Sequence, residues 1–232
     1  MLHIGSATRL ALDCLFPRLC VGCGRIGSYL CDRCQRHLSY LYGPLCPHCG
    51  QFQPSGILCP SCVSVRSDIS AIRSVFRFDG VIRRAIIDLK YHNLRAIVPT
   101  LSAFLSARLS DEAFAADLII PVPLHAKKLR RRGYNQSALL AAELGALQRI
   151  AVDDGALIRT REGDSQVNSR DAESRRNNVA GAFACMDAAV SGKRILVVDD
   201  VCTTGATLEA CASALRAAGS SEVWGLTVAR EV

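Results

Sequence analysis

The chain has 232 residues, half of them hydrophobic, and 28 basic against 21 acidic residues give it a formal net charge of +7. These values indicate a soluble globular protein with a sizeable core, large enough for one α/β domain and a small accessory module, and the positive charge favours polyanionic partners without identifying one. No apolar run approaches the roughly 18 residues of a membrane span, and the first residues lack a basic leader with a cleavage site, so we expect a cytoplasmic protein.

Four C-x2-C pairs follow a short apolar stripe over residues 7–16, which predicts a helix docked on the protein itself. Each C-x2-C turn can hold two thiolate sulfurs about 2.3 Å from one metal ion, and a second such turn completes a tetrahedral site. We therefore predict two structural Zn²⁺ ions, in sequential or crossed pairing, held by Cys20/Cys23, Cys31/Cys34, Cys46/Cys49 and Cys59/Cys62. The alternatives are a disulfide framework and redox-active turns. A disulfide framework would be accompanied by a secretion signal and a redox-active turn by a βα context, and the sequence shows neither.

The residues between these cysteines are too poor in apolar side chains to fold unaided, so metal binding is expected to supply the folding free energy. His37 and His48 are predicted to be bystanders, because eight paired cysteines already complete both sites. Cys14, Cys185 and Cys211 lie in apolar surroundings and are predicted to be small core residues.

From about residue 66 cysteines become sparse and strands alternate with helices, which predicts an α/β domain with a mostly parallel sheet flanked by helices. We divide the chain into an N-terminal module of residues 1–65 and a domain of residues 66–232. Apolar periodicity predicts four helices, near residues 80–89, 98–109, 140–147 and 208–215. Continuous apolar runs predict three buried strands, at residues 117–124, 194–198 and 222–228.

The segment VVDDVCTTGATL, residues 197–208, runs from a strand into a helix. Ligands of open α/β sheets bind beyond the carboxyl ends of strands, and successive backbone N–H groups, threonine hydroxyls and a helix N-terminus suit a phosphate monoester. Asp199 and Asp200 would be repelled by phosphate, but they suit the hydroxyls of an attached sugar, directly or through Mg²⁺. A 5-phosphorylated ribose has both features, whereas the alternative is a strand followed by a capped helix.

This segment resembles the motif with which type I phosphoribosyltransferases bind 5-phosphoribosyl 1-pyrophosphate (PRPP), and the whole chain resembles the ComF/GntX family of competence and DNA-utilisation proteins. The other similar segments are the double zinc ribbon, LKYHN, PVPLHAKKLRRRGYNQS and RTREGDSQVNSRDAESRRNNVAGAF. The resemblance implies that Asp199 and Asp200 are the catalytic carboxylates that hold the ribose hydroxyls, and it assigns the 5-phosphate to Thr203, Thr204, Gly205 and Thr207. Cys202 stands where an apolar residue is usual, which indicates pocket lining and not a nucleophile.

Two basic segments face the predicted site. In the resembled enzymes the loop after the 117–124 strand contacts pyrophosphate, and the candidates here are Arg132, Gly133 and Asn135, because a tight Gly turn beside an Arg admits a diphosphate. The candidates for nucleic-acid phosphates, with a solvated basic face as the alternative, are Lys127, Lys128, Arg130 and Arg131. Residues 159–178 are predicted to be a mobile loop that orders over a ligand. Lys90 ends an apolar helix, where it either contacts PRPP or caps the helix.

Two functions follow from this resemblance. The first is a PRPP-binding, phosphoribosyltransferase-like protein, in which Mg²⁺ accompanies PRPP and transfer depends on positioning, not on a nucleophile. The second is a competence protein that binds single-stranded DNA, with a regulatory PRPP site and other competence or DNA-processing proteins as partners, although aromatic stacking platforms are scarce. Because the chain stops at Val232 directly after the last strand, a base-recognising hood would have to come from residues 66–116 or from the zinc module.

Overall fold

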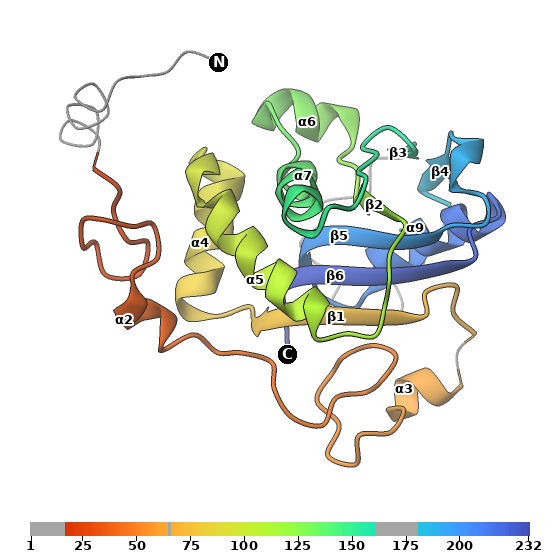
Figure 1. Cartoon of the computed structure of the whole chain (residues 1–232), viewed down its shortest axis with the longest axis horizontal. Helices are drawn as coiled ribbons and strands as arrows, with labels where there is room; N and C mark the ends of the chain where they lie inside the picture. Colours follow the sequence, from red (N-terminus) through yellow and green to blue (C-terminus); the bar gives the residue numbers. More distant parts are fainter. Residues whose placement is uncertain (1–16, 65, 161–180) are drawn as a thin grey trace.

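A four-stranded parallel sheet forms the centre of the molecule (Figure 1). The computed structural model describes residues 17–64, 66–160 and 181–232. The strand order is β1-β6-β5-β2, with all three pairings parallel, and the strands are β1 (Ala71–Arg77), β6 (Glu222–Arg230), β5 (Arg194–Cys202) and β2 (Leu118–Pro121). The two central strands are mostly buried because both faces of the sheet are covered.

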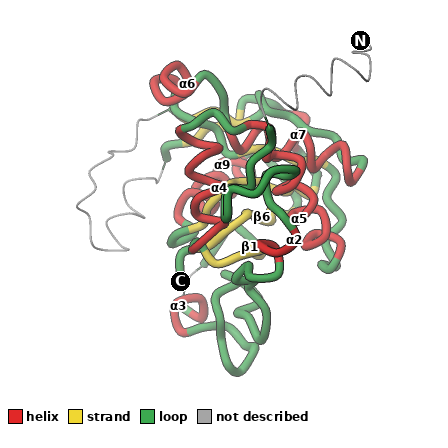
Figure 2. The backbone as a smooth tube through the Cα atoms, turned by 90° about the vertical axis from the view of Figure 1, so that its left-hand side faces the viewer, coloured by secondary structure: helices red, strands yellow, loops and turns green. Residues whose placement is uncertain are grey.

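Helices cover both faces of this sheet (Figures 1 and 2). One face packs against α4 (Gly80–Tyr91), the 3-10 turn Arg95–Ile97, α5 (Val98–Ser110) and α7 (Gln136–Gln148). The other packs against α9 (Ala206–Ala217), the antiparallel pair β3 (Leu157–Arg159) and β4 (Phe183–Cys185), and the 3-10 turn Ala188–Val190. No helix in the described part of the chain is long and apolar enough to cross a membrane.

The four predicted helices and three predicted strands are present, and the α/β fold class is confirmed. Three strands were missed. Strand β1 was hidden by Arg73 and Arg77, which interrupt its apolar pattern at the edge of the sheet. The β3–β4 pair is too short for a periodic signal. The predicted helix over residues 7–16, Cys14, and residues 161–178 of the predicted mobile loop lie outside the described residues.

The basic stretch after β2, which the sequence indicated to be a loop, forms helix α6 (Ala126–Arg132). His125 caps its N-terminus, where its side chain accepts a hydrogen bond from the backbone N–H of Lys127. Gly133 ends the helix with φ +80°, and its N–H donates to the carbonyl of Leu129. These two caps explain how so strongly charged a segment becomes helical.

The N-terminal module contains two similar ribbons with one helical turn each, α2 (Asp32–Gln35) and α3 (Pro60–Val63). The first ribbon lies beside α4, and the second lies beside β1 (Figure 1). Backbone N–H groups along the outer edge of β1 donate to this module: Ile72 to the carbonyl of His48, and Arg77 to that of Ser39. The module therefore covers an edge strand that would otherwise present unpaired backbone groups. The division at residues 65 and 66 stays a prediction.

Gly50 is where the second ribbon comes closest to the sheet. Its φ is +71°, and a Cβ atom built there would lie 2.4 Å from the carbonyl oxygen of Ile72. Gly24 occupies the equivalent turn of the first ribbon with φ +73°, and its Cβ would meet nothing within 4 Å. The two glycines share the same backbone requirement, but only Gly50 is also constrained by the neighbouring strand.

We expect Gly50→Ala to destabilise the second ribbon more than Gly24→Ala destabilises the first. Both substitutions incur the left-handed backbone cost of about 1–2 kcal/mol, and Gly50→Ala adds an overpacking cost of about 1–3 kcal/mol. Zinc release to a colorimetric chelator, followed against urea, should begin at lower urea for one of two zinc equivalents in Gly50→Ala. Equal urea midpoints for the two variants would show that the second ribbon does not rest on β1 at this point.

Candidate functional site

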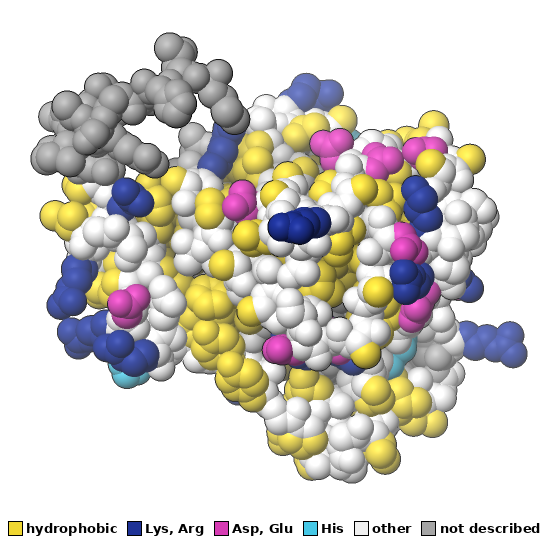
Figure 3. Space-filling model, in the orientation of Figure 1, with side chains coloured by type: hydrophobic (Ala, Val, Ile, Leu, Met, Phe, Trp, Pro, Cys, Tyr) yellow, Lys and Arg dark blue, Asp and Glu magenta, His cyan; other side chains and the backbone are white. Residues whose placement is uncertain are grey.

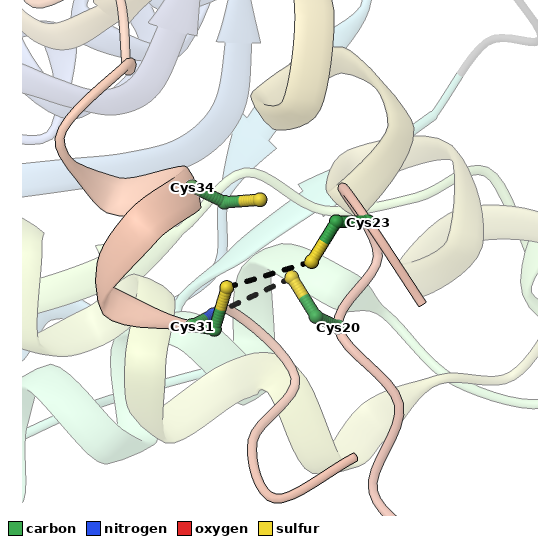
Figure 4. A group of neighbouring side chains, drawn as sticks. All are labelled: Cys20, Cys23, Cys31 and Cys34. Atoms are coloured by element: carbon green, nitrogen blue, oxygen red, sulfur yellow. Dashed lines mark hydrogen bonds between the residues drawn. The ribbon is translucent and has the colours of Figure 1, made fainter. Parts of the chain in front are cut away.

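The eight paired cysteines form two separate clusters, one in each ribbon. The four sulfur atoms of each cluster lie within 4.8 Å of one another, and the sets are Cys20, Cys23, Cys31 and Cys34, and Cys46, Cys49, Cys59 and Cys62. Figure 4 shows the first set converging on one point. The pairing is therefore sequential, and the crossed alternative is excluded for these clusters.

Each cluster is built by the same local geometry. The first C-x2-C pair sits on a tight turn closed by a left-handed glycine, and the second begins at the N-cap of a one-turn helix. The backbone N–H of Cys31 donates to Cys20 Sγ at 3.4 Å, and that of Cys59 donates to Cys46 Sγ at the same distance. Such N–H donors stabilise thiolates, the form in which cysteine binds metal.

The electrostatics of the first cluster fit a divalent cation. Burial opposes ionisation of Cys20, but backbone N–H donors led by that of Cys31 outweigh it and lower its pKa to about 6. Desolvation, together with hydrogen bonds to the other three thiols of the cluster, raises the pKa of Cys34 to about 12. Four thiolates therefore cannot ionise together without a cation. Four sulfur ligands with no open position suit a structural Zn²⁺.

A second group of polar side chains lies at the carboxyl end of β5. Asp199 and Asp200 lie within β5 itself and not in a loop beyond it, because β5 stays paired with β6 as far as Cys202. Asp199 Oδ1 accepts hydrogen bonds from Ser137 Oγ at 2.7 Å and from the backbone N–H of Asp200 at 2.9 Å. Lys90 Nζ lies 2.9 Å from Asp200 Oδ2, and Asp200 is buried. Lys90 thus reaches the site and does more than end a helix.

Two carboxylates share one lysine in this group. Burial, followed by the negative charge of Asp200, raises the pKa of Asp199 to about 7, although the Ser137 hydrogen bond and Lys90 oppose the rise. For Lys90, burial lowers the pKa, but the charge of Asp200 outweighs it and the net shift is upward. The group therefore carries more negative charge than the protein compensates, which is what a ligand with hydroxyl donors or a divalent cation would relieve.

The predicted phosphate loop connects β5 to α9. Gly205 adopts φ +86° at the N-cap of α9, and Thr204 Oγ1 accepts a hydrogen bond from the backbone N–H of Ala206 at 3.3 Å. Thr203 is exposed and Thr207 is half-buried. The loop thus has the left-handed turn and free helix N-terminus that a phosphate cradle requires.

The side chains predicted to contact pyrophosphate are mostly engaged within the protein. Asn135 caps α7 by accepting from the N–H of Ser137 at 3.0 Å, and it donates to the carbonyl of Val122 at 2.9 Å. It positions Ser137, which in turn holds Asp199. Arg132 donates to Gln136 Oε1, and its guanidinium lies 5.3 Å from the ring centre of Tyr91. Gly133 provides the turn at the end of α6.

Helix α6 carries the predicted nucleic-acid candidates on the surface, where basic side chains stand out at the top of Figure 3. Arg130 and Arg131 are exposed, as is Lys127, whereas Lys128 is half-buried. Basic side chains also gather over the first ribbon, at the left of the same view. The surface thus offers two separate basic regions.

A pocket of about 450 Å³ lies between the second ribbon and the start of α9. Its lining includes His48, Gln51, Ile72, Thr204, Glu209 and Arg230, but not the Asp199–Asp200 pair. The second ribbon of the zinc module thus forms one wall of this pocket. Its role in a base-recognising hood stays a prediction. Sequence reasoning missed Ser137, although it lies within GYNQS, and Arg230, whose signal was a cation at the end of an apolar strand.

The three cysteines outside the clusters differ in their surroundings. Cys211 is fully buried in the core, as predicted. Cys185 is half-buried and its thiol donates to the carbonyl of Asp187. Cys202 is buried beside the loop, and desolvation raises its pKa to about 11, which disfavours a nucleophilic thiolate. His48 Nε2 is hydrogen-bonded to the carbonyl of Ile69 and takes no part in the second cluster.

Comparison with known proteins divides the chain in the same way. A double zinc ribbon domain matches residues 11–63, and a phosphoribosyl transferase domain matches residues 130–230. Competence protein F of Haemophilus influenzae is 31% identical over 85% of this chain and 89% of its own. The DNA utilization protein YhgH of Escherichia coli is 31% identical over 92% and 95%, and competence protein ComFC of Bacillus subtilis is 26% identical over 83% and 80%.

Solved structures resemble the chain more loosely. The glutamine PRPP amidotransferase from B. subtilis, 21% identical, covers 57% of this chain and 26% of its own with a TM-score of 0.40. A hypoxanthine phosphoribosyltransferase from Staphylococcus aureus, 13% identical, covers 57% and 62% with a TM-score of 0.34. Likeness at this level carries no functional weight.

The raised pKa of Asp199 predicts how stability depends on pH. In the unfolded chain this carboxyl ionises near its ordinary pKa, whereas in the folded protein it stays protonated up to about pH 7. Stability should therefore fall as pH rises between these values, because the unfolded state loses its proton first. Each unit of the shift corresponds to about 1.4 kcal/mol.

Asp199→Asn should remove this dependence, so that the variant gains stability over the wild type at pH 8 but not at pH 4. Urea unfolding of both proteins in Mg²⁺-free buffer at several pH values measures it, with the exposed Asp154→Asn as control. A wild-type stability that is constant between pH 4 and 7 would contradict the prediction.

Proposed function

The chain belongs to the ComF family, which contains competence protein F and the DNA utilization protein YhgH, and on this basis we propose that its α/β domain binds PRPP at the carboxyl end of β5. The observation that carries the proposal is the array of Lys90, Asp200, Asp199 and Ser137 beside the loop that opens α9. A strand followed by a capped helix needs neither a second carboxylate nor a buried lysine.

The two parts of the array suit the two parts of the ligand. Asp199 and Asp200 accept hydrogen bonds from the ribose hydroxyls, and the N–H groups and hydroxyls from Thr203 to Thr207 hold the 5-phosphate. Retaining two adjacent carboxylates, of which Asp200 is buried, is costly, and such a breach of local stability rules is expected where a ligand uses them. The carboxylate excess also suits Mg²⁺ bound together with the pyrophosphate.

Transfer of the phosphoribosyl group would require little covalent help from the chain. The C1–oxygen bond to pyrophosphate breaks, and positive charge develops on the ribose ring as the nucleophile approaches C1. Asp199 and Asp200 fix the ring through its hydroxyls, and Arg132 at the end of α6 would bind the departing pyrophosphate if it released Gln136. Mg²⁺, when bound, would neutralise the charge of the leaving group.

We expect Asp199→Asn together with Asp200→Asn to abolish PRPP binding without loss of zinc. Each carboxylate contributes a charged hydrogen bond of about 1.5–3 kcal/mol, so affinity should fall by more than a hundredfold, whereas Thr204→Val should cost only about 0.5–1.5 kcal/mol. Calorimetry with PRPP and Mg²⁺ measures both. The control is Asp111→Asn with Asp154→Asn, which removes the same charge from exposed positions. Unchanged affinity in the double variant of the site would reject the proposal.

Binding of single-stranded nucleic acid is a second candidate function, favoured by α6. Its cations lie on a short helix that projects from the domain (Figure 2). Two relatives are named for competence and DNA utilisation. In this function the PRPP site would regulate DNA handling.

Neutralising Arg130 and Arg131 to Gln should weaken binding of a single-stranded oligonucleotide and flatten its salt dependence. Each phosphate contact contributes about −0.7 to the slope of log K against log salt, so the slope should change by about 1.4. Fluorescence anisotropy at several salt concentrations measures it. Arg149→Gln with Lys193→Gln, at the C-cap of α7 and directly before β5, should leave the slope unchanged. Binding that is absent at low salt would exclude this function.

A further inference from the structure

Arg230, the last residue of β6, is the largest fully buried side chain in the described part of the molecule, with 1% of its surface exposed. Its Nη1 donates to Cys202 Sγ at 3.2 Å, and its Nε has no hydrogen-bond partner. No carboxylate within the described ranges forms an ion pair with it. A thiol is a weak acceptor, and the raised pKa of Cys202 keeps that thiol neutral. A buried cation without a counter-charge is costly, so this arrangement requires an explanation.

The pocket beside the second ribbon explains the buried charge of Arg230, because Arg230 forms part of the wall of this pocket. Glu209 is the one acidic residue among the described lining, and it is already engaged: it accepts from Ser67 Oγ and from the backbone N–H of Asp68 at 2.8 Å. It therefore fastens the 67–69 segment to α9 and does not neutralise Arg230. His48, also in the lining, has a buried Nδ1 without a hydrogen-bond partner.

The second ribbon also lines the pocket with Gln51, Ser61 and the cluster residues Cys49 and Cys62, and two further walls are apolar. Ile69 and Ile72 form one side, and Ala206 and Ala210 of α9 form another. A volume of about 450 Å³ is that of a small-molecule site. Thr204 and Gly205 also contribute, so the pocket adjoins the loop to which we assign the 5-phosphate. A flat ring suits such apolar walls, and an anionic group would pair with the guanidinium of Arg230 and with the N-terminus of α9.

We propose that this pocket is a second ligand site, which binds a small molecule with a planar ring and one anionic group, carboxylate or phosphate, held by Arg230. The second zinc ribbon is then a wall of a binding site and not only a folding module. The proposal does not require that PRPP binds, but it rests on the proposed function in one respect: the shared loop would couple the two sites if both are occupied. Two sources share the required chemistry, a heteroaromatic carboxylate and a nucleoside monophosphate.

The test is calorimetry on the full-length, zinc-loaded protein with charged and uncharged pairs of probes. Uracil-6-carboxylate is compared with uracil, and uridine and adenosine monophosphates are compared with their nucleosides. We expect at least one charged probe to bind at least tenfold more tightly than its uncharged partner, and the pair that shows this identifies the source. Equal binding within every pair, or none, overturns the proposal.

Two variants test the role of Arg230. Arg230→Met should lower the affinity for the charged probe at least tenfold and should raise Tm or leave it unchanged, because an uncompensated buried charge is removed. Arg73→Met is the matched control on the neighbouring strand: Arg73 is paired with Glu112 at 3.0 Å, so its loss should lower Tm and spare probe binding. Ala210→Leu, which fills the pocket without changing charge, should also block the probe.

The other outcomes discriminate between explanations. If Arg230→Met lowers Tm and releases zinc from the second cluster, Arg230 is a counter-charge for the thiolates and the proposal fails. If it weakens PRPP while no ring compound binds, Arg230 belongs to the phosphoribosyl site and the proposal fails. If a charged probe binds and depends on Arg230 but PRPP does not bind, the second site stands and the proposed PRPP function fails instead.

Discussion

The charge of two adjacent carboxylates at the end of β5 is the constraint around which the α/β domain is arranged. Asp200 is buried and Asp199 is half-buried, and the strand that carries them stays paired with β6 as far as Cys202. Lys90 from α4 and Ser137 from α7 converge on them, and Asn135 fixes Ser137. The ends of α4 and α7, on one face of the sheet, thus lie where the charge of the two carboxylates must be compensated. The compensation is incomplete, and the proposed binding of a ligand would relieve this deficit.

The opposite side of the same strand end depends on the zinc module. Its second ribbon has little apolar core, so its shape comes from the thiolate cluster and from hydrogen bonds with the edge of β1. Gly50 permits that contact, and it brings His48 and Gln51 beside the loop that opens α9. The shape of the pocket therefore depends on the shape of the ribbon, because the ribbon forms one wall of the pocket.

Sequence patterns located most of the elements and, by their spacing, both cysteine clusters. They were less reliable where charge interrupts an apolar pattern. Strand β1 was missed because Arg73 and Ser74 lie within it, and only the structure shows Arg73 paired with Glu112 and Ser74 bonded to Thr227. Helix α6 was taken for a loop because it has no apolar face. Both errors have the same cause: a polar side chain does not reveal its partner in the sequence. The contact of Asn135 with a ligand stays a prediction, and the structure shows that this side chain also caps a helix.

The sequence by itself determined what is encoded within a few consecutive residues: the C-x2-C turns, the alternation of strands and helices, and the DDVCTTGAT segment that joins a strand end to a helix N-terminus. Local spacing suffices there because the interacting atoms belong to one turn or one strand end. Only the tertiary structure decided the sequential pairing of the clusters, the contact of Lys90 with Asp200, and the position of Arg230 in a pocket closed by the second ribbon. These contacts join residues far apart in the chain, so their geometry depends on how the sheet and the ribbons pack together.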